Sequence, residues 1–335
     1  MPGPERYNPA VAGIGTFISV GRSLEKAMDR VRLADELGFD AAFTTHTAGR
    51  DSLSVLMAYA SASERLRLGS GVMPIFSRTP VATAQAAATI DEFSGGRMVL
   101  GIGVSHKVTV ENWFQATIPK PVTQMREYAG IVRALLRGEQ PADGEFFRTN
   151  FGFMGYEPNS DIPIYIAGLS PRMLSLAGEI GDGVVLWLCG PTYIEQVVVP
   201  AVREGREKAG KELEGFDIVA AVPSALTDDR DAAHTTMRQS LITYASLPFY
   251  RSMLERSGFE DDLAAFDEGI GAGDMERATG GLSDRMLEEL FAIGSAEDVQ
   301  AGVKRYLDSG ATTPGVAAVP GTDYEATLRT VAELL

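Results

Sequence analysis

The chain has 335 residues, of which 45% are hydrophobic and 22% charged, the composition of a folded protein with ample apolar surface for a core. Acidic residues number 45 against 30 basic ones, and Lys and Arg form no cluster longer than a pair, so we expect neither nucleic acid nor an anionic membrane as a partner. A single cysteine, Cys189, excludes an intramolecular disulfide and a thiolate zinc site.

The sequence carries no secretory signal pattern and no apolar run of bilayer-spanning length. We therefore expect a cytoplasmic protein. The length suits one barrel domain, because β/α barrels routinely exceed about 250 residues.

Short β-branched runs alternate with amphipathic stretches of helical period, the pattern of a parallel sheet covered by helices. The eight strands that we expect are residues 11–19, 40–46, 66–75, 97–105, 162–168, 183–189, 216–226 and 314–320. The helices that we expect are residues 23–38, 51–63, 79–93, 122–136, 171–180, 192–209, 296–307 and 324–334. This alternation predicts an α/β fold, a single (β/α)8 TIM barrel over residues 1–335.

Two stretches interrupt the alternation. Residues 138–160 are rich in aromatics and glycine and predict an irregular or hairpin insertion before the fifth strand. Residues 228–293 predict a helical insertion between strands seven and eight. Insertions of this size roof the active site of a barrel or form a dimer contact, and we expect a homodimer.

Barrel enzymes carry their catalytic groups at the carboxyl ends of the strands, and two of the three histidines fall there. His46 ends the second strand and His106 follows the fourth. Because these strands alternate around a barrel, both imidazoles can approach one central volume, where each can transfer a proton near neutral pH. The alternative is a histidine that only forms hydrogen bonds at a strand end. His234 lies in a predicted helix and is expected to be structural or exposed.

Glycines mark the third and fourth strands near the same end. Gly71 and Pro74 stand where barrel wall is expected, which predicts a bulge at a ligand site or, alternatively, a kink at a barrel corner. Gly101 and Gly103 do not form a dinucleotide-binding fingerprint, because the third glycine is missing and we expect no helix directly after them. We interpret them as admitting a flat ligand close to the backbone.

The turn after the fifth strand predicts an anion site. Ser170 suits a helix N-cap, Pro171 the first helical position, and Arg172 adds a positive charge. Helix N-termini bind phosphate through free N–H groups, so we expect a phosphorylated cofactor tail here; the alternative is an ordinary β/α turn. No HxH, HExxH or paired-carboxylate spacing accompanies the histidines, and we expect no metal.

Several aromatic side chains are candidates for an apolar lining around the barrel mouth, with ordinary packing as the alternative. They are Trp113, Phe114, Phe153, Tyr156 and Trp187.

At these motifs the sequence resembles the luciferase-like superfamily, and within it the coenzyme F420-dependent oxidoreductases that include methylenetetrahydromethanopterin reductase. The resemblance runs nearly end to end. It is carried by the stretches LGSGVMPIFSRTPVATAQAAATIDEFSGGRMVLGIGVSHK, KPVTQMREYAGIVRALLRGE, IPIYIAGLSPRMLSLAGEIGDGVVLWL and AIGSAEDV.

The resemblance implies a deazaflavin site at the barrel mouth. It implies that Gly71 and Val72 are joined by a non-prolyl cis peptide bond whose bulge backs the ring, that His46 contacts the ring, and that residues 228–293 are the family's helical insertion. The other cofactor-binding residues that it implies are Gly103, Val104, Ser105, His106 and Lys107 along the ring, and Ala167, Gly168, Leu169, Pro171, Arg172 and Met173 toward the phosphate.

Two positions depart from the family pattern. Thr45 stands where relatives often have Asp, and His106 stands where several have a carboxylate proposed to handle protons. A carboxylic-acid mechanism is therefore not carried over, and His106 either replaces that acid or only binds.

The resemblance implies hydride transfer between reduced deazaflavin and a small organic substrate, an activated C=C, C=N or C=O group, or the reverse oxidation of an alcohol, with His46 or His106 supplying the proton. Two other functions remain open at this point: an FMN-dependent two-component monooxygenase on the same barrel, and a non-catalytic cofactor-binding protein.

Overall fold

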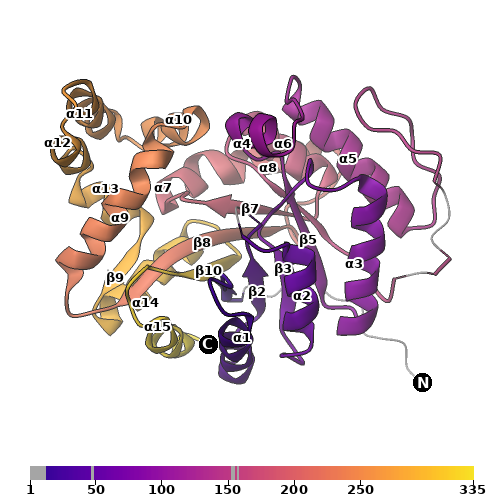
Figure 1. Cartoon of the computed structure of the whole chain (residues 1–335), viewed down its shortest axis with the longest axis horizontal. Helices are drawn as coiled ribbons and strands as arrows, with labels where there is room; N and C mark the ends of the chain where they lie inside the picture. Colours follow the sequence, from indigo (N-terminus) through magenta and orange to yellow (C-terminus); the bar gives the residue numbers. More distant parts are fainter. Residues whose placement is uncertain (1–12, 47–48, 152–154, 157) are drawn as a thin grey trace.

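The computed structural model describes residues 13–46, 49–151, 155–156 and 158–335. Its parallel strands follow the order β10-β1-β2-β3-β5-β6-β7-β8, and β10 also pairs with β8, so the sheet closes into a barrel (Figure 1). The barrel strands are β1 (Gly15–Phe17), β2 (Ala41–Thr44), β3 (Arg67–Ser70) with β4 (Met73–Pro74), β5 (Met98–Gly103), β6 (Ile164–Ala167), β7 (Gly183–Trp187), β8 (Asp217–Leu226) and β10 (Thr313–Ala318).

The eight strands expected from the sequence are confirmed, with residues 11 and 12 lying outside the described residues. The third is divided: β3 ends at Ser70 and β4 resumes at Met73, with the predicted bulge between them. A further strand, β9 (Ala292–Gly294), pairs with the end of β8 and was not expected, because three residues are too few to show a period of two.

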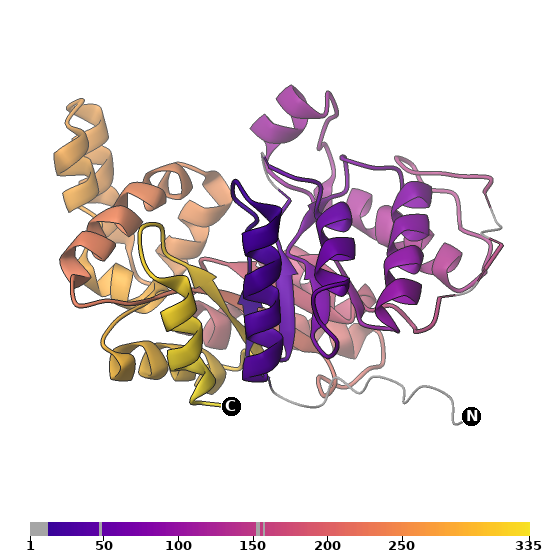
Figure 2. The ribbon, with the colours of Figure 1, turned by 60° about the horizontal axis from the view of Figure 1, so that its bottom comes forward.

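The helices that cover the barrel lie close to their expected positions (Figures 1 and 2). They are α1 (Leu24–Leu37), α2 (Ser52–Ala60), α3 (Pro80–Ser94), α5 (Pro121–Leu136), α6 (Pro171–Ile180), α8 (Val199–Lys208), α14 (Ala296–Asp308) and α15 (Tyr324–Ala332). Local signals set their ends. Ser23 caps α1 by accepting from the N–H of Lys26, and Gly38 ends it at φ +90°.

The expected helix 192–209 is interrupted. It comprises α7 (Pro191–Tyr193), a π-helical turn η1 (Ile194–Val198), and then α8. The wide turn ends two residues before Pro200, which lacks the N–H that a regular α-helix would use.

The lumen of the barrel is filled by its own core, separate from the apolar layer between strands and helices. The lumen cluster is Phe17, Ala41, Phe43, Val99, Tyr165, Val185, Val219, Ala221 and Ala317. Phe17 and Phe43 are register partners on β1 and β2, and their rings stack with centroids 5.2 Å apart. The barrel is therefore a packed core, and ligands must bind at its rim.

A buried polar network closes the amino end of the barrel. The Arg67 guanidinium donates to Asp217 at 2.9 Å and to Asp40, and Thr313 donates to Asp217 at 2.8 Å. Burial alone would raise the pKa of Asp217, but Arg67 and the threonine hydroxyls lower it below its usual range. Charged partners thus satisfy one another at the end opposite the expected site.

The chain between β8 and β9 forms a helical insertion: α9 (Arg230–Ala245), α10 (Pro248–Arg256), α11 (Glu260–Gly271), α12 (Met275–Gly280) and α13 (Asp284–Leu290). It lies to one side of the barrel (Figures 1 and 2). The described part of residues 138–160 is irregular, without the alternative hairpin. In the described part of the chain, no helix is long and apolar enough to cross a membrane.

Candidate active site

The barrel wall is buried along most of its strands and becomes half-exposed at their carboxyl ends. Past the carboxyl ends of β2, β3, β5, β6 and β7, the half-exposed positions are Thr45 and His46, Gly71 and Val72, Val104 to His106, Ala167, and Trp187. Because parallel strands end at the same rim, these positions surround one mouth. The predicted ring-binding residues are therefore brought together, with β3 and β4 lying between β2 and β5.

His46 is held by the first turn of α2. Its Nδ1 accepts a hydrogen bond from the backbone N–H of Ser52 at 3.3 Å and lies 3.1 Å from the Ser52 hydroxyl. Because a backbone N–H can only donate, the neutral imidazole carries its proton on Nε2. Nδ1 also lies 3.9 Å from Asp51 Oδ2, which pairs with Arg78 at 3.0 Å.

The charge state of His46 follows from these neighbours. Burial lowers its pKa, Asp51 raises the pKa in part, and Arg78 lowers it again. The pKa of His46 is therefore lower than 6.5, and the ring is neutral at pH 7. His46 can therefore present an N–H donor without carrying a charge.

His106 stands on the other side of the bulge, between β5 and a short helix, α4 (Lys107–Trp113). Its ring packs on Tyr250 of α10, with centroids 5.7 Å apart and planes at 46°. Burial lowers the pKa of His106, and the imidazole is neutral at pH 7. The expectation that no helix opens after Gly103 is wrong: Ser105, at φ +60°, turns the chain into α4, which has only seven residues and too short a period to detect.

The peptide bond between Gly71 and Val72 is cis, which confirms this implication of the resemblance. The Gly71 N–H donates to Thr44 O at 2.8 Å, which ties the bulge to the end of β2. The glycines of β5 accommodate the bulge. A Cβ on Gly101 would lie 1.9 Å from Ser70 O, and one on Gly103 would lie 2.8 Å from Val72 Cγ2.

Gly101 and Gly103 were interpreted as leaving room for a ligand beside the backbone. That interpretation is wrong, because the protein itself fills this room. The space beside both glycines is filled by the protein's own backbone and by Val72. Val72 is itself half-exposed and packs on the lumen cluster, so the bulge presents an apolar side chain at the mouth.

The start of α6 has the capping predicted for an anion site. The Ser170 hydroxyl accepts from the N–H of Met173 at 3.3 Å, and Pro171 occupies the first turn. Arg172 is exposed and lines a groove of about 420 Å³ between α5, α6 and α8. The other cations there are paired: Arg126 with Glu179 and Lys208 with Glu204.

The aromatic candidates separate into different environments. Trp187 ends β7 and packs on the lumen cluster at the mouth. Tyr156 instead donates to Gln85 O on the outer side of the barrel, and Trp113 is 56% exposed on α4. Phe114 directly follows α4 and is half-exposed, and Phe153 lies outside the described residues.

His234 and Cys189 are buried and have structural roles. His234 is buried in α9, with Nδ1 3.7 Å from Asp284 Oδ1. Cys189 is buried, and burial raises the pKa of its thiol, so it is unreactive. Among the residues that the structure describes, no group of His, Cys, Asp and Glu could hold a metal ion.

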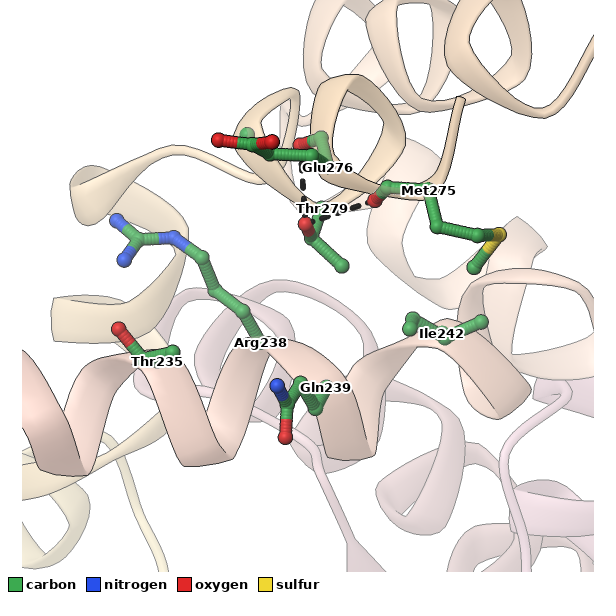
Figure 3. A pocket seen from close by; sticks show the side chains of 8 residues that line it. Thr235, Arg238, Gln239, Ile242, Met275, Glu276 and Thr279 are labelled. Atoms are coloured by element: carbon green, nitrogen blue, oxygen red, sulfur yellow. Dashed lines mark hydrogen bonds between the residues drawn. The ribbon is translucent and has the colours of Figure 1, made fainter. Parts of the chain in front are cut away.

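A second groove, of about 750 Å³, lies within the helical insertion between α9 and α12 (Figure 3). Its lining is Thr235, Arg238, Gln239, Ile242, Met275, Glu276, Thr279 and Gly280. The Arg238 guanidinium already donates to Leu282 O and to Asp284. None of the predicted site residues lines this groove, and the mouth remains the candidate active site.

Comparison with known proteins decides the family. A family model described as luciferase-like monooxygenase matches residues 10–313. The chain belongs to the luciferase-like monooxygenase family. This luciferase-like chain is 34% identical over 310 residues to 5,10-methylenetetrahydromethanopterin reductase of Archaeoglobus fulgidus, covering 90% of the chain and 92% of the relative.

Two further likenesses fall in the branch that the sequence resemblance predicted, and they confirm it. A putative coenzyme F420-dependent oxidoreductase of Mycobacterium tuberculosis is 30% identical, with 86% of this chain and 89% of the relative covered. The structure of the coenzyme F420-dependent tetrahydromethanopterin reductase of Methanopyrus kandleri superposes with a TM-score of 0.84 at 26% identity, over 97% of this luciferase-like chain and 98% of that one.

Two groups of residues at this mouth were not predicted from the sequence. The tautomer and charge of His46 are set by Ser52, Asp51 and Arg78. Of these, Asp51 was predicted only as the first residue of a helix. Tyr244 and Tyr250 reach the mouth from the insertion. The sequence around a tyrosine on an amphipathic helix does not show whether its side chain only packs in the core or lines a binding site.

Proposed function

We propose that this protein is a coenzyme F420-dependent oxidoreductase that transfers a hydride between the deazaflavin and a small organic substrate, an activated C=C, C=N or C=O group or an alcohol. The observation that carries the proposal is the half-exposed bulge of Gly71 and Val72 at the barrel mouth, with His46 after β2 on one side and His106 after β5 on the other. It occurs in a chain whose relatives include F420-dependent enzymes over most of its length.

The residues at the mouth fit a flat heterocycle with an anionic tail. Val72 offers an apolar support for a ring, and His46 offers an N–H donor beside it. In the proposal, Gly103 to Lys107 line the ring. The tail lies over Ala167 to Met173, where the first turn of α6 supplies N–H groups and Arg172 a positive charge.

When bound, the deazaflavin supplies or accepts the hydride. The protein's own residues supply placement and proton handling. Ser52 fixes the proton of His46 on Nε2, so that this nitrogen donates a hydrogen bond to a carbonyl or imine acceptor. His106 has no ion-pair partner among the described residues and, as a neutral imidazole, can pass a proton between solvent and substrate.

Titration of the purified protein with F420 and with FMN tests the proposal. We expect F420 fluorescence to be quenched with saturation at micromolar or tighter affinity, and FMN to bind at least tenfold more weakly. Tight FMN binding with indifference to F420 would instead establish the two-component monooxygenase. F420 binding without turnover of any activated alkene, imine, ketone or alcohol would establish the non-catalytic alternative.

We also propose a homodimer. The insertion exposes Phe249, Ile270 and Met275, whose side chains are 58%, 43% and 48% exposed, and burial of such apolar surface favours association. Light scattering should give twice the chain mass of 35.8 kDa, and a mass equal to one chain at micromolar concentration would contradict this.

A further inference from the structure

Four aromatic rings form a continuous arc at the barrel mouth, and two of them come from the helical insertion. His106 packs on Tyr250 with centroids 5.7 Å apart, Tyr250 on Tyr244 at 4.8 Å, and Tyr244 on Trp187 at 6.4 Å. The arc therefore runs from the loop after β5, across α10 and α9, to the carboxyl end of β7. We call these four residues the aromatic arc.

The ends of the aromatic arc belong to segments that pack near the predicted cofactor support. Trp187 and Val72 are both half-buried and both pack on the lumen cluster. At the other end, Gly103 lies against Val72 Cγ2, three residues before His106. A ring resting on the Val72 bulge would thus have the aromatic arc as its neighbour on the side of β5, β6 and β7.

The aromatic arc carries no charge at neutral pH. Burial lowers the pKa of His106 and raises the pKa of Tyr244 and Tyr250, so all three are neutral. No ion pair among the described residues includes a member of the arc. A charged group placed against these rings would lose its hydration without gaining a partner.

We infer that the half-exposed rings of Tyr244 and Trp187, backed by the buried ring of Tyr250, form the wall against which the substrate lies, and that this wall selects an uncharged, flat, conjugated carbonyl compound such as a cyclic enone. The inference rests on the proposed function and names its substrate class. Planar rings pack favourably on aromatic side chains, whereas a carboxylate or phosphate at the reacting end has no cation in the arc to bind.

With reduced deazaflavin bound as the hydride donor, an enone would gain a hydride at its β carbon as the C=C π bond breaks, and His106 would pass a proton from solvent to the α carbon. The enone would be reduced to the saturated ketone, and the deazaflavin would be oxidised.

The experiment compares two acceptors that share one ring, 2-cyclohexenone and its 5-carboxylate, whose charge lies away from the reacting C=C bond, each with reduced F420. We expect kcat/KM of the wild type to be at least tenfold higher for the neutral ring. Tyr244→Lys places an ammonium group in the aromatic arc at a half-exposed position, and it should shift the ratio at least tenfold toward the carboxylate. Thr243→Lys is the matched control, because it adds the same charge to α9 at the exposed neighbouring position.

Tyr244→Leu is a second test of the wall, which can be used if the Tyr244→Lys variant does not fold. It removes the ring but keeps an apolar side chain, and it should raise KM for 2-cyclohexenone at least fivefold while the Kd for F420, measured by fluorescence quenching, stays within twofold.

The possible failures are distinguishable. A wild type that does not bind F420 overturns the proposed function. A wild type that binds F420 but prefers the carboxylate, or reduces neither ring, overturns the substrate class. An unchanged ratio in Tyr244→Lys, or an unchanged KM in Tyr244→Leu, overturns the assignment of the wall.

Discussion

At the residue scale, the two mouth histidines share a chemical type but differ in what surrounds them. His46 is fixed by the Ser52 N–H and lies near the Asp51–Arg78 pair, so its tautomer is set by the protein. His106 contacts an aromatic ring, and its ring nitrogens bond to none of the described residues, so they can accept from or donate to a ligand. The first arrangement suits orientation and the second suits proton exchange with solvent.

The lowered histidine pKa values predict how stability depends on pH. Histidine in an unfolded chain titrates near pH 6.5, and burial lowers the pKa of His46 and His106 below that value in the folded protein. Between the two values the unfolded chain binds more protons, so the free energy of unfolding falls as the pH drops below about 6.5. Above pH 7 both states are neutral and the contribution is constant.

Urea denaturation at pH 7.5 and 5.5 measures this effect. We expect the midpoint to fall on acidification, and the fall to be smaller in the His46→Gln, His106→Gln double variant. Equal falls in the variant and the wild type would contradict the prediction, and the interval from pH 7.5 to 8.5 is the control.

At the element scale, the mouth depends on how closely β5 approaches the bulge between β3 and β4. Gly101 and Gly103 lack the Cβ atoms that would strike Ser70 O and Val72. The approach is enforced by hydrogen bonds, because the Ser70 hydroxyl donates to Gly101 O at 2.7 Å and accepts from its N–H at 3.0 Å. Val72 is therefore placed by packing between strands.

Substitution of Gly103 by alanine should disturb the mouth specifically. Its Cβ would lie 2.8 Å from Val72 Cγ2, so Val72 must shift, and we expect the Kd for F420 to rise at least tenfold. The control is Gly130→Ala on an exposed face of α5, where an added Cβ would contact no other segment within 4 Å. That variant should gain about 0.5–1 kcal/mol of stability and bind F420 normally. Unchanged affinity in Gly103→Ala would separate the bulge from cofactor binding.

At the scale of the whole molecule, the amino end of the barrel stabilises the fold, and the carboxyl end carries the candidate active site. The amino end is closed by Arg67, Asp217 and Asp40, whereas the carboxyl end carries the bulge and the aromatic arc. The lumen cluster fills the space between them, so a change at one end need not reach the other.

Asp217→Ala tests this division. Removing one partner of a buried ion pair leaves Arg67 partly uncompensated and should cost about 3–5 kcal/mol of stability, as measured by guanidinium denaturation. The Kd for F420 should stay within twofold. Asp29→Ala is the control, because its pair with Arg32 is exposed and should contribute less than about 1 kcal/mol. A loss of F420 affinity matching the loss of stability would show that the two ends are coupled.

Much of the fold was determined by the sequence itself, because strands and helices leave local patterns. The eight barrel strands, the Ser23 and Ser170 caps and the break near Gly71 all follow from residues close together in the chain. The short elements β9 and α4 were missed because three and seven residues are too few to show a period.

Which side chains meet at the mouth depends on the tertiary structure. The sequence placed His46 and His106 at strand ends, but barrel closure set them on either side of the bulge. Only the folded insertion brings Tyr250 onto His106, and only packing between strands shows that Val72 fills the space beside Gly103. Local periodicity records which side chains are buried, whereas contacts between distant segments depend on how the whole chain packs.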